Sequence, residues 1–256
     1  MAEVILTDAI TAVEEFDLSG HSNEVGIDRQ RVIRDATQFG DSVVNFRAGL
    51  PSGVFSMAGL FDSAADAQVG VDQLATTLRH VTIIPAGAST GGVGWSMPGT
   101  FEYNLAGRVN DLFRWTARLD QGEDTTLYAP GSIAIPSQRT RGTVLYNERT
   151  TTGPDSGDAI QLGAITASET LYCLVHATEF EGSGSQGVTA ILQSDDNASF
   201  TSPTLRASLG AAASSGPFFT IFAVAGAVTD DYWRLQLDLN SLAWDALTIR
   251  ALAVIQ

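Results

Sequence analysis

The chain has 256 residues, of which 44% are hydrophobic and 17% charged, so it holds enough apolar material for real cores and is not a disordered protein. Its net charge is −15. Residues 1–136 hold 17 acids and 8 arginines, and residues 137–256 hold 12 acids and 6 arginines, so neither part has the basic arm that groove binding of nucleic acid needs. An acidic channel that DNA passes without sticking is compatible with this charge, because like charges suppress phosphate contacts.

The start of the chain lacks a basic segment followed by a long apolar run, and no stretch approaches the roughly 20 apolar residues of a membrane span. We therefore expect a soluble protein that is made in the cytoplasm without export and has no membrane partner. Cys173 is the only cysteine and lies in an apolar run, so we expect a small core residue; a reactive thiol is the alternative.

Short runs of Val, Ile, Thr and aromatic residues alternate with Gly, Asn, Asp and Pro, which predicts a mostly β protein. The clearest early strand covers residues 54–61. Alternation puts Phe55 and Met57 on one face of this strand and Ser56 and Ala58 on the other, so we expect a half-buried strand.

One helix is expected after this strand, because residues 62–66 offer an N-cap and the chain to residue 78 has helical spacing. The apolar stripe of the helix would consist of Val71, Leu74, Ala75 and Leu78.

Strands are expected at residues 80–85 and 100–105, on either side of a Gly-rich loop at 86–94. This loop suits a segment that is ordered by a partner. A phosphate-cradling loop is the sharper alternative, but the Gly-Lys-Ser/Thr ending of a P-loop is missing. Residues 111–119 predict another half-exposed strand, with Arg114 and Arg118 on its wetter face and Phe113, Trp115, Ala117 and Leu119 on the other.

Turn and linker residues between 128 and 143 predict a domain boundary near residue 137, which gives domains 1–136 and 137–256. The second domain should be a jelly-roll or immunoglobulin-like β-sandwich, because about 120 residues hold roughly six to eight strands. Its strands are expected at 159–165, 171–178, 187–194, 218–224, 231–239 and 247–255.

The sequence contains no recognisable catalytic, cofactor-binding or metal-binding motif. His21, His80 and His176 have no second ligand at metal spacing, and neither a cofactor motif nor a G-x-S-x-G elbow is present. We therefore expect no metal, no cofactor and no enzyme activity. A hydrolase triad assembled from distant residues is the alternative, since such a triad leaves no local motif.

Three carboxylate doublets, Glu14-Glu15, Asp195-Asp196 and Asp230-Asp231, suggest either turn acids or acid/base and Ca²⁺ sites. Neighbours on a strand point to opposite faces, which favours turn acids. The candidate contacts of a glycan-binding platform are Asp195, Asp196, Tyr232 and Trp233. The alternative is that Trp233 packs in the hydrophobic core and contacts no ligand.

Several phrases follow one another in the first half at regular intervals. Residues 16–25 read FDLSGHSNEV, and residues 35–41 read DATQFGD. Together with a later stretch at 103–112, they resemble the major tail tube proteins of long-tailed phages, across about 110 residues. The residues that match the family-like phrases are Asp35, Thr37, Phe39, Gly40, Asp41, Gly49, Leu50, Gly53, Gly59 and Asp62.

The resemblance implies two packed β-sheets with one flanking helix, joined as homo-hexameric rings that stack into a hollow tube for viral DNA. Its implied partners are a tape measure protein and DNA in the lumen, a tail terminator and tail tip proteins. The location would be the virion tail, after assembly in the host cytoplasm. The Gly-rich loop, with Gly87, Gly91, Gly92 and Gly94, would contact the neighbouring ring.

The second domain would lie outside the tube. Residues 188–200 and 231–235 resemble jelly-roll accessory domains of phage structural proteins. The alternative function is a capsid or tail decoration module that binds host-surface glycans.

Overall fold

The fold is described from a computed structural model of the chain. The structure describes residues 9–38, 43–74, 78–85, 91–108, 111–121, 140–147, 155–182, 188–212, 217–239 and 244–255. These residues form sixteen strands and one α-helix, which confirms the mostly β prediction.

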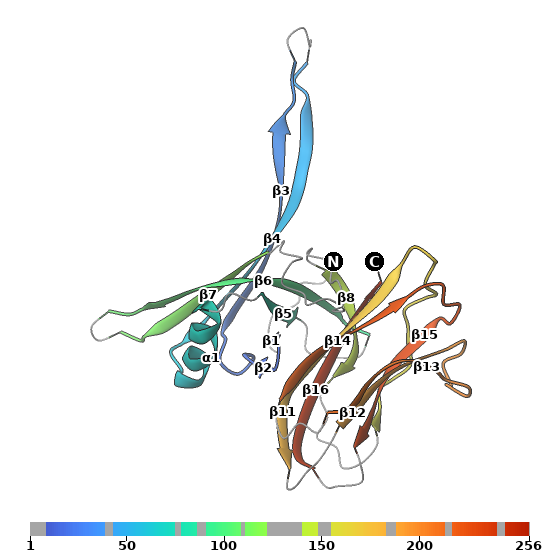
Figure 1. Cartoon of the computed structure of the whole chain (residues 1–256). Helices are drawn as coiled ribbons and strands as arrows, with labels where there is room; N and C mark the ends of the chain where they lie inside the picture. Colours follow the sequence, from blue (N-terminus) through green and yellow to red (C-terminus); the bar gives the residue numbers. More distant parts are fainter. Residues whose placement is uncertain are drawn as a thin grey trace.

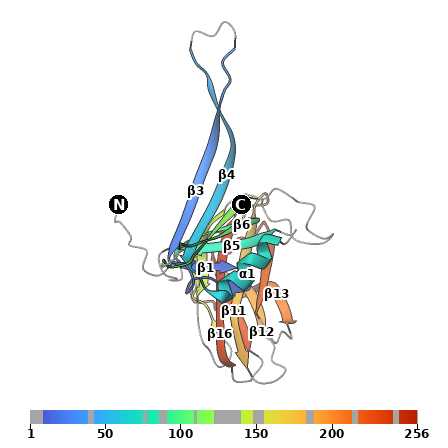
Figure 2. The same ribbon diagram turned by 90° about the vertical axis from the view of Figure 1, so that its left-hand side faces the viewer.

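The first half builds a β body from which a long hairpin projects (Figures 1 and 2). Its elements are β1 (Ile10–Val13), β2 (Phe16–Asp17), β3 (Glu24–Asp35), β4 (Phe46–Leu60), α1 (Ser63–Leu74), β5 (Arg79–Ile84), β6 (Val93–Ala106) and β7 (Arg114–Gln121). Strands β3 and β4 form the hairpin, and only their lower parts are joined to the body, through β7.

Strand β6 is shared by two layers. Its first part pairs with β5 up to Gly99, and the part from Gly99 to Ala106 pairs with β7. The two layers enclose one core, with Phe55, Met57 and Trp115 from one layer packed against residues of the other. At Gly99 a Cβ atom would lie 2.2 Å from the carbonyl oxygen of Asp120, so the crossover needs glycine.

The expected helix is present, but its buried face is not the expected one. Asp62 caps the helix, since its Oδ1 accepts a hydrogen bond of 2.7 Å from the amide of Ala64. The helix ends at Leu74, and Val71 and Leu74 are 62% and 84% exposed, so the predicted stripe is wrong. Ala65, Val69 and Asp72 are buried instead. The error arose because Asp72 forms an ion pair with Arg79, which lets a carboxylate take a buried position.

The second half consists of two facing sheets. Its strands are β8 (Thr140–Asn147), β9 (Asp155–Ser156), β10 (Ile160–Gln161), β11 (Thr170–Gly182), β12 (Val188–Asp195), β13 (Thr204–Ala212), β14 (Phe218–Ala225), β15 (Tyr232–Leu239) and β16 (Trp244–Ile255). One layer has the order β14-β11-β16-β8, and the other has the order β10-β15-β12-β13, with β9 beside β15.

The pairs in these two layers are nested along the chain. Strand β8 pairs with β16, β9 and β10 pair with β15, β11 pairs with β14, and β12 pairs with β13, all antiparallel. The first strand thus meets the last and the innermost strands meet each other. The core between the layers holds Cys173 and Trp233, both fully buried, which confirms the core prediction for the cysteine.

The two halves share a continuous sheet. Strand β8 pairs with β6 through Val93–Ser96 and with β16 through Arg250–Ala253, so it bridges the halves and belongs to an eleven-stranded sheet. Residues 140–143, expected as part of a linker, therefore lie in a strand. The boundary proposed at residue 137 lies outside the described residues.

A buried polar contact also joins the halves. His176 of β11 is 1% exposed, and its Nδ1 donates to the Glu14 carbonyl oxygen at 2.7 Å, while its Nε2 lies 2.8 Å from the Thr82 hydroxyl. Burial lowers the pKa of His176 to about 4, so the ring is neutral near pH 7. Nearby, Arg250 Nη1 donates to Asp17 Oδ2 at 2.7 Å. These contacts orient the second half on the first.

Candidate functional site

The most distinctive surface is the outer face of the four-stranded sheet β3-β4-β7-β6. Along β4 and β7, outward-facing and buried side chains alternate: Phe55, Met57, Trp115, Ala117 and Leu119 are buried, and the residues between them face outward. The alternation predicted for residues 54–61 and 111–119 is thus confirmed within β4 and β7, at 54–60 and 114–119, but not at Phe61 and Phe113, which lie outside these strands and are exposed. The outward side chains are mostly polar, so one face of this sheet packs against the core and the other is exposed to solvent.

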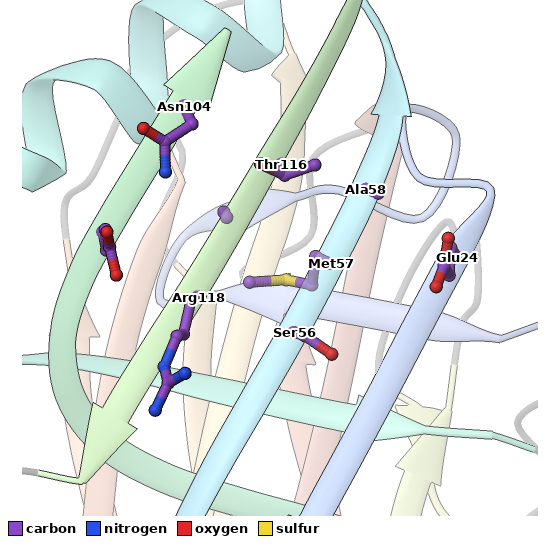
Figure 3. Close-up of a pocket in the computed structure, with 9 residues that line it drawn as sticks. Glu24, Ser56, Met57, Ala58, Asn104, Thr116 and Arg118 are labelled. Atoms are coloured by element: carbon purple, nitrogen blue, oxygen red, sulfur yellow. The ribbon is translucent and has the colours of Figure 1, made fainter. Parts of the chain in front are cut away.

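A shallow groove of about 210 Å³ lies on this face (Figure 3). Register explains which side chains meet there, because Glu24, Ala58, Thr116 and Asn104 form one row across the four strands. The next row contains Ser56, Arg118 and Glu102. Strand β3 begins at the groove with Glu24, whereas β4, β7 and β6 run through it, so the groove is a depression in the sheet surface near the start of β3.

Among the residues of this face whose side chains the structure describes, acids outnumber bases. Alternation assigns to this part of the face four carboxylates, Glu24, Asp28, Glu102 and Asp120, and two guanidinium groups, Arg114 and Arg118, for a net charge of −2 (4 acids against 2 bases). Arg118 is paired with Asp120, with Nη2 and Oδ1 2.9 Å apart, and this hydrogen bond raises the pKa of Arg118. Part of the positive charge is therefore neutralised locally.

Both edges of this sheet are open within the described residues. The only strand paired with β3 is β4, and Thr100–Ala106 of β6 pair on one side alone, with β7. Because every pairing in the order β3-β4-β7-β6 is antiparallel, β3 and β6 run in opposite directions. Open edges of this length are templates for further strand pairing.

Exposed apolar side chains gather at two places in the first half. Val43 and Val44, at the tip of the β3–β4 hairpin, are 66% and 60% exposed. The second place, here called the aromatic patch, consists of Phe61, Leu105, Leu112 and Phe113. The Phe61 and Phe113 rings lie 5.2 Å apart in the patch. Phe113, expected on the drier face of its strand, is 44% exposed because the core ends before it.

The family-like phrases coincide with structural devices. Asp35 Oδ1 accepts the amide of Thr37 at 2.8 Å, and the Thr37 hydroxyl accepts the amide of Asn45 at 3.0 Å, so this pair closes the base of the hairpin tip. Phe39, Gly40 and Asp41 lie outside the described residues, as does Gly87. Gly49, Leu50 and Gly53 are part of β4.

Two further residues of the phrases join distant segments. At Gly59, a Cβ atom would lie 2.0 Å from the carbonyl oxygen of His21, so a larger residue would push the segments apart. Asp62, besides capping α1, lies 2.9 Å from His21 Nδ1, and the Ala64 amide and His21 lower the pKa of this carboxyl.

The described part of the Gly-rich loop lies against the second half. A Cβ at Gly94 would approach Leu252 Cδ1 to 2.8 Å, and Gly91, with φ +83°, lies near Ile160. Gly92 lies between these two contacts, just before β6 begins. The contact of this loop with another ring stays a prediction.

The candidate glycan residues are separated by burial. Trp233 is fully buried and its Nε1 donates to the Gly163 carbonyl oxygen at 3.1 Å, so its ring offers no surface for stacking. Asp195 is 2% exposed and accepts the amide of Ser202 at 2.9 Å. Asp196 and Tyr232 are both more exposed. The four residues therefore do not form one platform.

The remaining doublets hold structural contacts as well. Asp230 accepts from Ser194 at 2.6 Å and from Arg206 at 2.7 Å, and these two bonds lower the pKa of its carboxyl. Glu14 accepts from Arg79 Nη1 at 2.6 Å, on the side of the first half that faces β11. Such satisfied carboxylates are typical of structural acids.

Among the described residues, no three His, Cys, Asp or Glu side chains are grouped so that they would hold a metal ion. The one described helix is too short to cross a membrane. The chain matches no protein-family model, and no curated protein matches it in sequence.

Proposed function

We propose that this chain is the structural subunit of a phage tail tube, in which the four-stranded sheets of six copies join edge to edge around a lumen that conducts viral DNA. The observation that carries the proposal is the sheet β3-β4-β7-β6, with its polar acidic face, its apolar buried face and two open edges of opposite direction.

Edge joining is compatible with rotational symmetry. When one copy is rotated about an axis to meet the next, its β3 comes beside β6 of the neighbour, and the two run antiparallel. On the core-facing side of such a joint, away from the lumen, the partly buried Val25 and Ile27 of one copy would lie next to Phe101 and Tyr103 of the neighbour. The apolar layer would therefore continue across the joint. A closed barrel of this kind leaves no strand edge exposed.

Barrel size supports six copies. Twenty-four strands spaced about 4.8 Å apart, with a usual tilt of 35–45°, give roughly 45–50 Å between facing backbones, whereas twelve strands from three copies give only about 25 Å. Side chains nearly fill the smaller barrel, but the larger one leaves room for a DNA duplex. The acidic face of each sheet, which points away from the subunit core, would line that lumen, and its negative charge would discourage contacts with DNA phosphates.

We infer that the second half is a jelly roll that decorates the exterior. The nested pairing of β8–β16 is the pattern of one long hairpin rolled into two sheets, which is the plan of a jelly roll. Two of its carboxylates, Asp195 and Asp230, accept hydrogen bonds from within this half. A tape measure protein, a tail terminator and tail tip proteins would be the partners of the complete tube.

Negative-stain electron microscopy of the purified protein over a range of concentrations tests the proposal. Hollow rings or tubes with a lumen close to the estimated width are expected. Monomers at all concentrations, together with glycan binding through the second half, would favour the alternative of a decoration or adhesion module. A tail initiator added to the sample controls for a nucleation requirement.

A further inference from the structure

The inference concerns the charge of the β3–β4 hairpin where it projects beyond the body. The outer hairpin, here defined as residues 29–53, holds 4 arginines and 2 acids, so its net charge is +2 (4 − 2). The rest of the chain holds 10 arginines and 27 acids, a net charge of −17 (10 − 27). The balance over residues 1–136, with 8 arginines against 17 acids, conceals this local excess of positive charge.

The positive charges belong to the paired strands and not to a loop. They are distributed over both strands of the hairpin: Arg29, Arg31, Arg34 and Arg47. The two acids come later, because Asp35 is the last residue of β3 and Asp41 follows it in the chain. Asp28 pairs with Val54, a residue of β4 that also pairs with β7, so this acid belongs to the body. The paired part of the outer hairpin therefore carries four bases against one acid.

Two of these arginines are opposite each other in the hairpin. Arg34 and Arg47 are register partners in the antiparallel pair. Like charges at opposite positions destabilise an antiparallel pair, and a two-stranded ribbon is only marginally stable by itself. A bound anion would relieve the repulsion and would stabilise the ribbon. The sequence of the outer hairpin therefore suits a ribbon that has an anionic partner.

The shape of the outer hairpin limits the choice of anion. From Arg29 to Asp35, β3 pairs only with β4 among the described residues, and Figures 1 and 2 show the ribbon standing clear of the body. These seven residues of β3 cover roughly 23 Å at about 3.3 Å per residue, or roughly two thirds of a turn of B-DNA. The major groove of B-DNA, about 12 Å wide, admits a two-stranded β-ribbon.

The end of the ribbon has a second feature that suits a duplex. Val43 and Val44 are 66% and 60% exposed there, and the hydrogen bonds of Asp35 and Thr37 close the base of this tip. Apolar side chains of DNA-binding proteins insert between base steps. A small anion would use neither the length of the ribbon nor its apolar end.

We propose that the outer hairpin binds double-stranded DNA, with the ribbon in the major groove and its arginines on the phosphates. The rest of the chain, with its net charge of −17, would repel the same duplex, so contact would be confined to the hairpin. This binding goes beyond the proposed tube function and does not depend on it, because a single chain carries the whole ribbon.

Fluorescence anisotropy of a labelled duplex tests the proposal with the full chain, at low salt and at concentrations where light scattering detects no assembly. The logarithm of the binding constant should fall with the logarithm of the salt concentration with a slope of about −3 to −4, because each neutralised phosphate contributes about −0.9. Arg31→Gln with Arg34→Gln and Arg47→Gln should weaken binding at least about tenfold and reduce the slope to about −1. The corresponding Arg→Lys changes should keep the affinity within about threefold, because ammonium groups also neutralise phosphates.

A matched control separates the hairpin from the overall charge. Arg108→Gln with Arg114→Gln and Arg118→Gln removes three exposed arginines of the body, so both triple Gln variants have a net charge of −18 (−15 − 3). The control should change the affinity less than about twofold. Equal losses in the two variants, or no binding by the unmodified chain at about 100 μM, would overturn the proposal. Self-association that the hairpin variant loses, without DNA binding by the unmodified chain, would assign the hairpin to an acidic surface of a second copy and would also overturn it.

Discussion

The two halves of the molecule are both built from β layers around a hydrophobic core, but they differ in how many hydrophobic residues they leave exposed. Both enclose a core between β layers, each with a fully buried Trp, Trp115 in the first half and Trp233 in the second. Counted over the described residues, the second half leaves one large hydrophobic residue exposed, Leu205, whereas the first half leaves nine. The comparison indicates that the second half is complete by itself and that the first half is shaped to be completed by other copies.

Replacing the buried Trp of each half should give the largest effects. Trp115→Ala and Trp233→Ala should each lower the free energy of unfolding by about 3–5 kcal/mol, because each removes a fully buried side chain. Below the unfolding transition, Trp233→Ala should still assemble, while Trp115→Ala, which loses the layer under the polar face, should not. Urea unfolding followed by electron microscopy measures both, and equal assembly by the two variants would break the comparison.

Acid should weaken the contact between the halves through His176. Its pKa is lowered by burial from 6.5 to about 4, so the unfolded chain takes up a proton that the folded chain does not. The stabilisation is complete above pH 6.5 and is lost as the pH falls toward 4, a loss of roughly 3 kcal/mol.

Urea unfolding at pH 7.5, 5.5 and 4.5 measures this loss. His176→Gln should be less stable at pH 7.5 and should show a smaller fall with pH, because Gln keeps hydrogen-bonding groups but does not titrate. The same fall in both proteins would mean that other groups cause it.

Reversing charge on the polar face should change DNA binding without changing the fold. Glu24→Lys with Glu102→Lys takes the face from −2 to +2 and the chain from −15 to −11 (four charges in each case). About tenfold more labelled duplex should sediment with its assemblies at low salt, and added salt should release it. Asp231→Lys with Asp238→Lys gives the chain the same net charge of −11 but places the changes in the second half, and equal binding by this control would argue against a lumen face.

The smallest effect is expected for the exposed pair of Arg118 and Asp120. Arg118→Ala should leave the urea midpoint within error of the unmodified protein, because exposed ion pairs contribute little to stability. A clear fall in the midpoint would show that this face is covered by something in the free protein.

The sequence pattern was informative where alternation was strict. Ser56 and Met57 were assigned to the correct faces, because polar and apolar side chains must alternate along a strand that has one solvent-exposed face. Strand β13 and the early part of β6 were not predicted, since their Gly, Ala and Ser content resembles that of loops. The helix face was misassigned because the ion pair of Asp72 with Arg79 depends on residues far apart in the fold and not on helical spacing.

The candidate site was predictable only in part. Excess acid in both halves indicated an acidic surface, but a register error of one residue exchanges the two faces of a strand, so its residues needed the fold. The nested pairing of the second half joins residues far apart in sequence, such as Tyr146 and Ala251, and no local pattern encodes it. The aromatic patch appears only when Phe61 and Phe113 are brought together.

The most direct test of the account is a reconstruction of the assembled protein by electron cryomicroscopy. The account predicts a closed barrel in which β3 of one copy pairs with residues 100–106 of the next and in which Glu24 and Glu102 face a lumen roughly 45–50 Å wide between backbones. A barrel lined by another face, or an assembly held together by the second half, would contradict it.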